Sequence, residues 1–140
     1  LYNESVQALS IIDINEAGDS LLSVLSADGS IDTMGVDAQE QLGGLQRVLA
    51  APSSAGGIDL VPIPGGGILV FSLLEPAFER GVWALPLSSV GLPSGRSHRI
   101  HDIIPSGPLA AADKATPGQG VAYYGVSGSL QGVAFSCSAP

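Results

Sequence analysis

Short apolar runs separated by glycine and proline are the dominant pattern of this chain. The runs are rich in Val, Ile, Leu and aromatic residues, which is typical of strands. Nineteen glycines and ten prolines separate them, and both residues favour turns. The pattern predicts a multi-stranded β domain with strands at Ser20–Ser26, Gly57–Ile63, Gly67–Leu74, Arg80–Leu87, Arg99–Ile104, Gly120–Val126 and Leu130–Cys137.

Two turns and one buried strand are marked clearly. Asp28-Gly29 precedes Ile31 and predicts a hairpin turn, because glycine accepts a positive φ there. The glycines that follow Pro64 predict a turn between two strongly apolar runs. The continuous apolar run Ile68–Phe71 is typical of a strand that is buried on both faces or at a subunit contact.

The stretch 37–50 is the only candidate helix, and the sequence leaves helix and strand open there. Its leucines and valine recur at helical spacing, and Asp37 is a suitable N-cap. The pair Gly43-Gly44 opposes a helix by about 2 kcal/mol relative to alanine. We therefore expect at most one short helix, at residues 37–50, in a mostly β fold.

The segment Ser88–Gly120 is predicted to be mostly loop or edge. It is rich in Gly, Pro and Ser, and proline is disfavoured in central strands.

The chain shows no internal repeat and no linker that would divide it. Residues 1–140 are thus expected to form a single compact antiparallel β-sandwich or barrel-like domain with Gly/Pro-rich loops. Because the chain starts without Met or a signal-like segment, we interpret it as a fragment of a longer protein.

Charge is sparse and unevenly distributed. Only 13% of residues are charged and 45% are apolar, which opposes disorder over the whole length. Eight of the thirteen acids lie in the first 40 residues, and the first base is Arg47, so the sequence predicts one acidic face. This balance opposes nucleic acid and anionic membranes as partners. No apolar run is long enough to predict membrane insertion, and the single Cys137 excludes an internal disulfide.

Patterns for catalysis are incomplete. His98, His101 and Asp102 offer too few zinc ligands, and residues three apart in a strand point to opposite faces. The stretch 125–129 lacks the final glycine of a nucleophile elbow, and Cys137 has no local signature. We expect no enzyme activity. A small hydrolase that uses a serine, Cys137 or the histidines remains a third hypothesis.

A calcium loop is suggested and then weakened by spacing. Asp13–Gly18 resembles the opening of such a loop, but the position for the closing Glu is Val24, so the EF-hand interpretation fails. A looser calcium site would draw on Asp13, Asn15, Asp19, Asp28 or Asp32. We interpret these acids first as a solvated surface.

Several short pieces together resemble one viral family. They are Leu1–Val6, Asp28-Gly29, Arg80–Trp83, Gly120–Tyr124 and the single Cys137 near the C-terminus. Their order and most of their spacings resemble the C-terminal protruding domain of betanodavirus capsid proteins. The interval from Leu1 to Arg80 is longer than in the fish viruses, which suggests an insertion or a more distant nodavirus.

The resemblance implies a function that is structural and adhesive. It implies a surface spike on a T=3 icosahedral virion, formed by dimers or trimers of this domain, that attaches to a host-cell receptor. The family's Asp-x-Asp calcium motif falls on Ala77 and Glu79, so one ligand is missing. Calcium is the one candidate cofactor, and its candidate ligands are Glu79, Asp28 and Asp32.

We expect the receptor to contact the polar segment Ser88–Gly120, because recognition residues tend to lie on loops held by a scaffold. The candidate receptor-facing residues are Arg96, His98, Arg99 and His101. The alternative hypothesis is a ligand-binding β-sandwich module of a bacterial secreted or surface protein, lectin-like or pilin-like. A shell domain preceding this segment would favour the virus, whereas a secretory or prepilin leader would favour the alternative.

Overall fold

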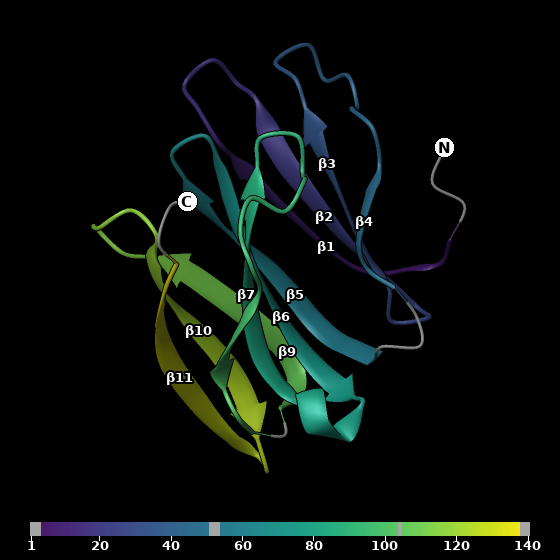
Figure 1. Cartoon of the computed structure of the whole chain (residues 1–140), viewed down its shortest axis with the longest axis vertical. Coiled ribbons are helices and arrows are strands. Elements are labelled where there is room, and N and C mark those ends of the chain that lie inside the picture. Colours follow the sequence, from purple (N-terminus) through teal and green to yellow (C-terminus); the bar gives the residue numbers. More distant parts are fainter. Residues whose placement is uncertain (1–3, 51–53, 104, 138–140) are drawn as a thin grey trace.

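The structure is a computed structural model that describes residues 4–50, 54–103 and 105–137. Within these ranges it is almost entirely β, and eleven strands form three antiparallel sheets (Figure 1). The one helical element described there, η1 (Ala77–Glu79), is a single 3₁₀ turn. The prediction of a mostly β, antiparallel, sandwich-like fold is confirmed.

Each sheet is a meander in which a strand pairs with its neighbour in the sequence. The N-terminal sheet consists of β1 (Val6–Asp13), β2 (Ser20–Ser26), β3 (Ile31–Val36) and β4 (Gln46–Leu49). The central sheet consists of β5 (Ser54–Ile63), β6 (Gly66–Glu75), β7 (Gly81–Ser88) and β8 (His98–His101). The C-terminal sheet consists of β9 (Ser106–Asp113), β10 (Gln119–Val126) and β11 (Ser129–Ser136).

The central sheet is buried on both faces, which makes the molecule three-layered (Figure 1). Strand β6 shows the reason, because its side chains alternate between two apolar cores. Leu69 and Phe71 pack in the first core, against the N-terminal sheet, while Ile68 and Val70 pack in the second core, against the C-terminal sheet. Each such side chain contributes about 1.5–3 kcal/mol when fully buried. The continuous apolar run of β6 therefore corresponds to a strand covered on both sides.

A carboxylate joins the three sheets where their edges meet. Asp59 on β5 accepts a hydrogen bond of 2.7 Å from the Ser10 hydroxyl on β1. Its other carboxylate oxygen accepts one of 2.7 Å from the backbone N–H of Ala111 on β9. These bonds satisfy polar groups at strand edges that would otherwise lack partners, so they stabilise the contact between the sheets.

The predicted strands and turns agree closely with the structure. Strand β2 has the predicted bounds, and the other six predicted strands overlap β5, β6, β7, β8, β10 and β11. The hairpin turns also form as predicted, with Gly29 at φ 87° and Gly65 at φ 77°. Leu1–Asn3 of the family-like opening and Ile104, the predicted end of one strand, lie outside the described residues.

The stretch 37–50 contains a strand and no helix. Asp37–Gln41 form a turn, Leu42 makes an isolated bridge to Val36, and β4 follows beside β3. A Cβ added at Gly43 would lie 3.2 Å from the carbonyl oxygen of Gly35. The glycine that disfavours a helix thus permits close approach to the neighbouring strand.

The expectation that Ser88–Gly120 is mostly loop or edge is confirmed, because β8 and β9, the two strands wholly within it, are each the end strand of a sheet. The sequence did not predict β9 as a strand. Strand β9 contains Gly107, Pro108 and a run of three alanines, which have low strand propensity. It forms because residues 109–113 pair in register with β10. Tertiary pairing here overrides local preference.

The acids of the first 40 residues all belong to the N-terminal sheet and its connections. They are exposed, apart from the half-buried Asp19 and the buried Asp32. This placement gives one side of the molecule most of its negative charge. In the part of the chain that the structure describes, no helix has the length and apolar character needed to cross a membrane.

Candidate functional site

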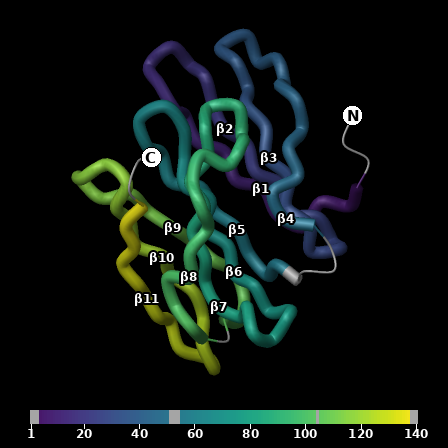
Figure 2. Tube along the Cα trace, viewed as in Figure 1, coloured from purple at the N-terminus to yellow at the C-terminus, as the bar shows by residue number. Residues whose placement is uncertain are grey.

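Three connections gather at one end of the molecule and form what we call the loop end. They are residues 14–19 between β1 and β2, residues 37–45 between β3 and β4, and residues 89–92 after β7. All three lie at the top of the trace in Figure 2. They come from the N-terminal and central sheets, and Ile14 of the first connection packs against the first core.

The first connection is an Asn-stabilised turn, and this explains its calcium-like sequence. The side-chain oxygen of Asn15 accepts hydrogen bonds from the backbone N–H groups of Ala17 and Asp19. Its amide nitrogen donates to Asp19 Oδ2 at 2.8 Å. Asx turns use side-chain oxygens in this way. The polar side chains here therefore shape the turn.

The second connection is tied to the first. The backbone N–H of Ala38 donates to Asp19 Oδ1 at 3.0 Å. Within the connection, Asp37 Oδ1 accepts hydrogen bonds of 2.9 Å from the backbone N–H groups of Gln39 and Gln41. These bonds hold two loops in one arrangement without a regular element.

The third connection is anchored on β3. The buried Thr33 hydroxyl donates to the carbonyl oxygen of Gly91. Gly91 has φ 84°, and a Cβ there would lie 2.9 Å from the Thr33 hydroxyl. A Cβ at Gly35 would lie 2.7 Å from the carbonyl oxygen of Ser89. Two glycines thus permit the β7–β8 connection to rest directly on the N-terminal sheet.

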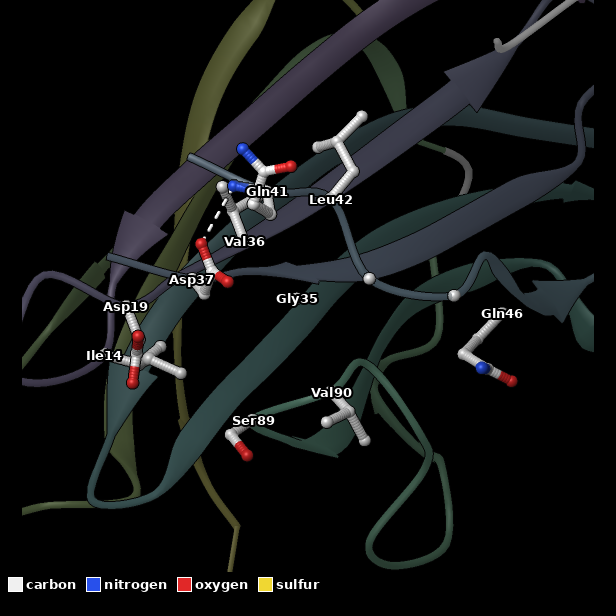
Figure 3. Close-up of a pocket in the computed structure, with 12 residues that line it drawn as sticks. Ile14, Asp19, Gly35, Val36, Asp37, Gln41, Leu42, Gln46, Ser89 and Val90 are labelled. Carbon is white, nitrogen blue, oxygen red and sulfur yellow. Dashed lines mark hydrogen bonds between the residues drawn. The ribbon is translucent and has the colours of Figure 1, made fainter. Parts of the chain in front are cut away.

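A pocket of about 320 Å³ lies between the second and third connections (Figure 3). In that view Ser89 and Val90 lie on one side, opposite Asp37, Gln41 and Leu42. The lining residues are Ile14, Asp19, Gly35, Val36, Asp37, Gln41, Leu42, Gly43, Gly44, Gln46, Ser89 and Val90. Two carboxylates, two side-chain amides and several aliphatic groups thus meet with no base among them.

The residues that line this pocket favour neutral or amino-bearing ligands over anions. Carboxylates without a neighbouring base repel anions, whereas amide and carboxylate oxygens accept hydrogen bonds from hydroxyl or amino groups. The aliphatic side chains offer contact to C–H surfaces. Around the pocket, Leu42 is 66% exposed and Val90 is 52% exposed. The arrangement suits a neutral or amino-bearing ligand with both hydroxyl and apolar surface.

A larger depression of about 830 Å³ runs between β1 and the start of β9. Its described lining consists of apolar residues, glycines, prolines and a few uncharged polar residues, with no ionisable side chain. We therefore place the candidate site at the loop end, where polar and apolar groups converge.

The four receptor-facing candidates do not converge. Arg96 is exposed on the loop, and His98 is half-buried opposite Ala84. The guanidinium of Arg99 lies 5.5 Å from the centre of the Trp83 ring and donates to the carbonyl oxygen of Arg80 at 3.1 Å. His101 Nδ1 contacts the hydroxyl of the buried Tyr124 on β10. Arg99 and His101 thus make structural contacts.

The three calcium candidates do not form a common site either. Asp32 is fully buried, and its two oxygens accept hydrogen bonds of 2.9 Å from Arg47. Asp28 accepts from the backbone and hydroxyl of Ser30, and Glu79 lies in η1, beside the central sheet. Among the residues described, no three His, Cys, Asp or Glu side chains gather as metal ligands.

The remaining chemical candidates lie in structural positions. Ser127 is in the β10–β11 turn with φ 49°, followed by Gly128 with φ 81°. Cys137 is buried in the second core, and burial raises the pKa of its thiol. A raised pKa lowers the thiolate fraction at neutral pH, which is unfavourable for a nucleophile. His98 and His101 lie on β8, on the neighbouring sheet.

Sequence reasoning named parts of the loop end, Asp19 as a calcium candidate and Ser89 and Val90 within the receptor-contacting segment, but it missed their convergence because the contacts are distant in the chain. Thr33 and Gly91 are 58 residues apart, and Asp19 and Ala38 are 19 apart. The local signals were Gly18, Gly35 and Gly91, which the sequence alone marks only as turn or strand glycines. No family model, no curated protein and no solved structure matches this chain.

Proposed function

We propose that this chain is a non-catalytic domain of a virion surface, the protruding domain of a nodavirus-type capsid protein. In this role the loop end attaches to a host-cell receptor, and copies of the domain associate into spikes. The observation that carries the proposal is the loop end itself, three connections fixed to one another and to β3 around a mixed polar and apolar pocket. Rigidly held loops suit recognition, because less freedom is lost on binding.

The sequence resemblance supplies the viral context. The pieces Asp28-Gly29, Arg80–Trp83 and Gly120–Tyr124 fall on a hairpin turn, at the start of β7 and on β10. These are ordered parts of the described scaffold. The charge distribution also fits a virion surface, because net negative charge keeps crowded copies soluble.

Receptor chemistry follows from the pocket lining. Asp19 and Asp37 lie in it without a base, so a sialylated or sulfated receptor is disfavoured there. A neutral glycan, or a peptide segment with amide and amino groups, is complementary to it. Leu42 and Val90 extend the contact by burying apolar surface.

The test is attachment of the purified, labelled domain to cultured fish and shrimp cells and to arrays of neutral and sialylated glycans. We expect the double variant Leu42→Ser/Val90→Ser to lose at least tenfold in binding, because both side chains are more than half exposed at the pocket. The matched control is Phe78→Ser, a 77% exposed apolar residue on η1.

Two results would contradict the attachment role. One is equal binding by the native domain and the Leu42→Ser/Val90→Ser variant when both are folded. The other is failure of the native domain to bind any of these cells. Binding to isolated glycans without binding to cells favours the alternative, a ligand-binding module of a bacterial secreted or surface protein, which the same pocket supports.

A further inference from the structure

The outer face of the C-terminal sheet is uncharged, and we propose that a second copy of this chain packs against it. Strand alternation and register define this face. Side chains at even positions of β10 point into the second core, so odd positions point outward. We call the outward set the neutral face: Ala110 and Ala112 on β9, Gln119, Val121, Tyr123 and Gly125 on β10, and Leu130, Gly132, Ala134 and Ser136 on β11.

The neutral face carries mostly small side chains. A Cβ added at Gly132 would lie 3.0 Å from the Tyr123 ring. The ring therefore lies across the glycine, while 44% of Tyr123 stays exposed. Around it the side chains are mostly alanine, serine and glycine, and Leu130, which is 78% exposed, is the largest aliphatic one. Small residues permit sheet-to-sheet stacking at about 10 Å.

The charge distribution favours another copy as the occupant. The net charge of −8 arises in the first 40 residues, which hold eight acids and no base, so contacts on that side would place like charges together. These acids lie on the strands and connections of the N-terminal sheet, the outer layer on the other side of the central sheet. Two copies joined at their neutral faces would keep those acidic sheets about 50 Å apart. That separation far exceeds the screening length of about 8 Å at physiological salt.

The outer face of the N-terminal sheet would not keep the acids of two copies apart. Leu9 and Ile11 on β1 are each 62% exposed there. Asp13 continues the same row of the strand, and Ser20 beside it donates a hydrogen bond to that carboxylate. A symmetric contact on the N-terminal sheet would bring its acids together. The neutral face is therefore the better self-contact.

The size of the neutral face predicts a weak contact. Three strands of about eight residues cover on the order of 400 Å² per copy, or about 800 Å² in total, which is less than the roughly 1,000 Å² of a stable specific interface. Here the inference rests on the proposed function, because tethering on a particle raises the effective concentration to about millimolar. The isolated domain is expected to be monomeric when dilute and dimeric when concentrated.

Sedimentation velocity of the purified domain, from about 10 µM to about 1 mM, tests this inference across the range of weak transient contacts. We expect a reversible, concentration-dependent dimer. Ala134→Glu should weaken it at least tenfold, because it places an unpaired charge in the contact. Ala27→Glu, an equivalent change at an exposed position of the β2–β3 turn, is the matched control and should leave the dimer unchanged.

Mixing variants makes the test specific for face-to-face packing. Ala134→Glu and Ala134→Lys should each be monomeric alone and should associate when mixed, because the two copies then bring opposite charges into one contact. A native domain that is monomeric throughout, or a dimer that Ala134→Glu leaves intact, would overturn the inference. Neither result depends on cells or glycans, so failure here is distinguishable from failure of the attachment role.

Discussion

At the residue scale, Arg47 organises the carboxylates at one end of the N-terminal sheet. Its guanidinium binds the buried Asp32 through two hydrogen bonds and the exposed Glu4 through one of 2.8 Å. Bonding to Arg47 is the largest cause that lowers the pKa of Glu4 below its ordinary value. Charge-assisted pairs of this kind are most consequential where one partner is buried. Asp32 is thus held by an ion pair within the fold.

Acid should destabilise the protein through these carboxylates. Hydrogen bonds from Ser30 lower the pKa of Asp28, as Arg47 does for Glu4. When a pKa is lower in the folded state, the unfolded chain binds more protons near that pKa. The resulting stability is present above the ordinary values of 4.5 and 3.8 and is lost as pH falls through the lowered ones. The thermal midpoint should therefore be nearly constant from about pH 8 to 5 and should fall below about pH 4.5.

Arg47→Met tests the cause of that acid dependence. It leaves the buried Asp32 without its cation, so the thermal midpoint at pH 7 should fall by several degrees. The fall in midpoint between pH 5 and pH 3 should also become smaller, because Glu4 loses the main cause of its lowered pKa. Arg96→Met, on the exposed loop, is the control. Equal midpoints for the two variants at pH 7 would show that the Arg47 pair contributes nothing.

At the element scale, the β7–β8 connection depends on its contact with β3. Gly91→Ala should destabilise this contact, because φ is 84° and the new Cβ would lie 3.0 Å from the backbone N of Met34. We expect a loss of about 2 kcal/mol in unfolding free energy, measured by denaturant titration. Gly107→Ala, with φ 76° and open space around its Cβ, is the control for backbone strain alone. A loss no larger than that of the control would remove the role assigned to this contact.

The sequence predicts elements where local and tertiary preferences agree. Strand β6 and the turns at Gly29 and Gly65 have strong local signals and formed as expected. Strand β1 was missed because it does not follow the usual alternation of buried apolar and exposed polar residues. Leu9 and Ile11 are exposed, and the inward-facing Ser10 between them is polar. Strand β9 was missed because proline, glycine and alanine disfavour strands. Strand β9 forms because its backbone pairs in register with β10, although its residues have low strand propensity.

The candidate site was less predictable than the fold for the same reason. The sequence directed attention to charged residues of the segment 88–120, and Arg96 is exposed there as expected of a surface loop. Arg99 and His101 instead contact Trp83 and Tyr124. The convergence of three connections depends on hydrogen bonds between distant residues, such as Thr33 to Gly91. Residue spacing within one segment cannot predict hydrogen bonds between residues that are distant in the chain.

At the scale of the whole molecule, the central sheet separates two surfaces with different tasks. The loop end lies where the N-terminal and central sheets meet, and the neutral face lies on the outside of the C-terminal sheet. Attachment and self-association then use separate surfaces, so neither blocks the other. This division requires the three sheets to behave as one rigid unit. The shared central sheet and the bonds of Asp59 to β1 and β9 supply that coupling.

Coincidence of unfolding in the two cores tests this claim most directly. The chain has one tryptophan and one cysteine; Trp83 packs against the first core, and Cys137 lies in the second. Trp83 fluorescence and pulsed labelling of the Cys137 thiol, followed across one denaturant titration, therefore report on the two cores separately. The account predicts a single transition with the same midpoint for both probes. Two separate midpoints would contradict it, because the sheets would then unfold independently.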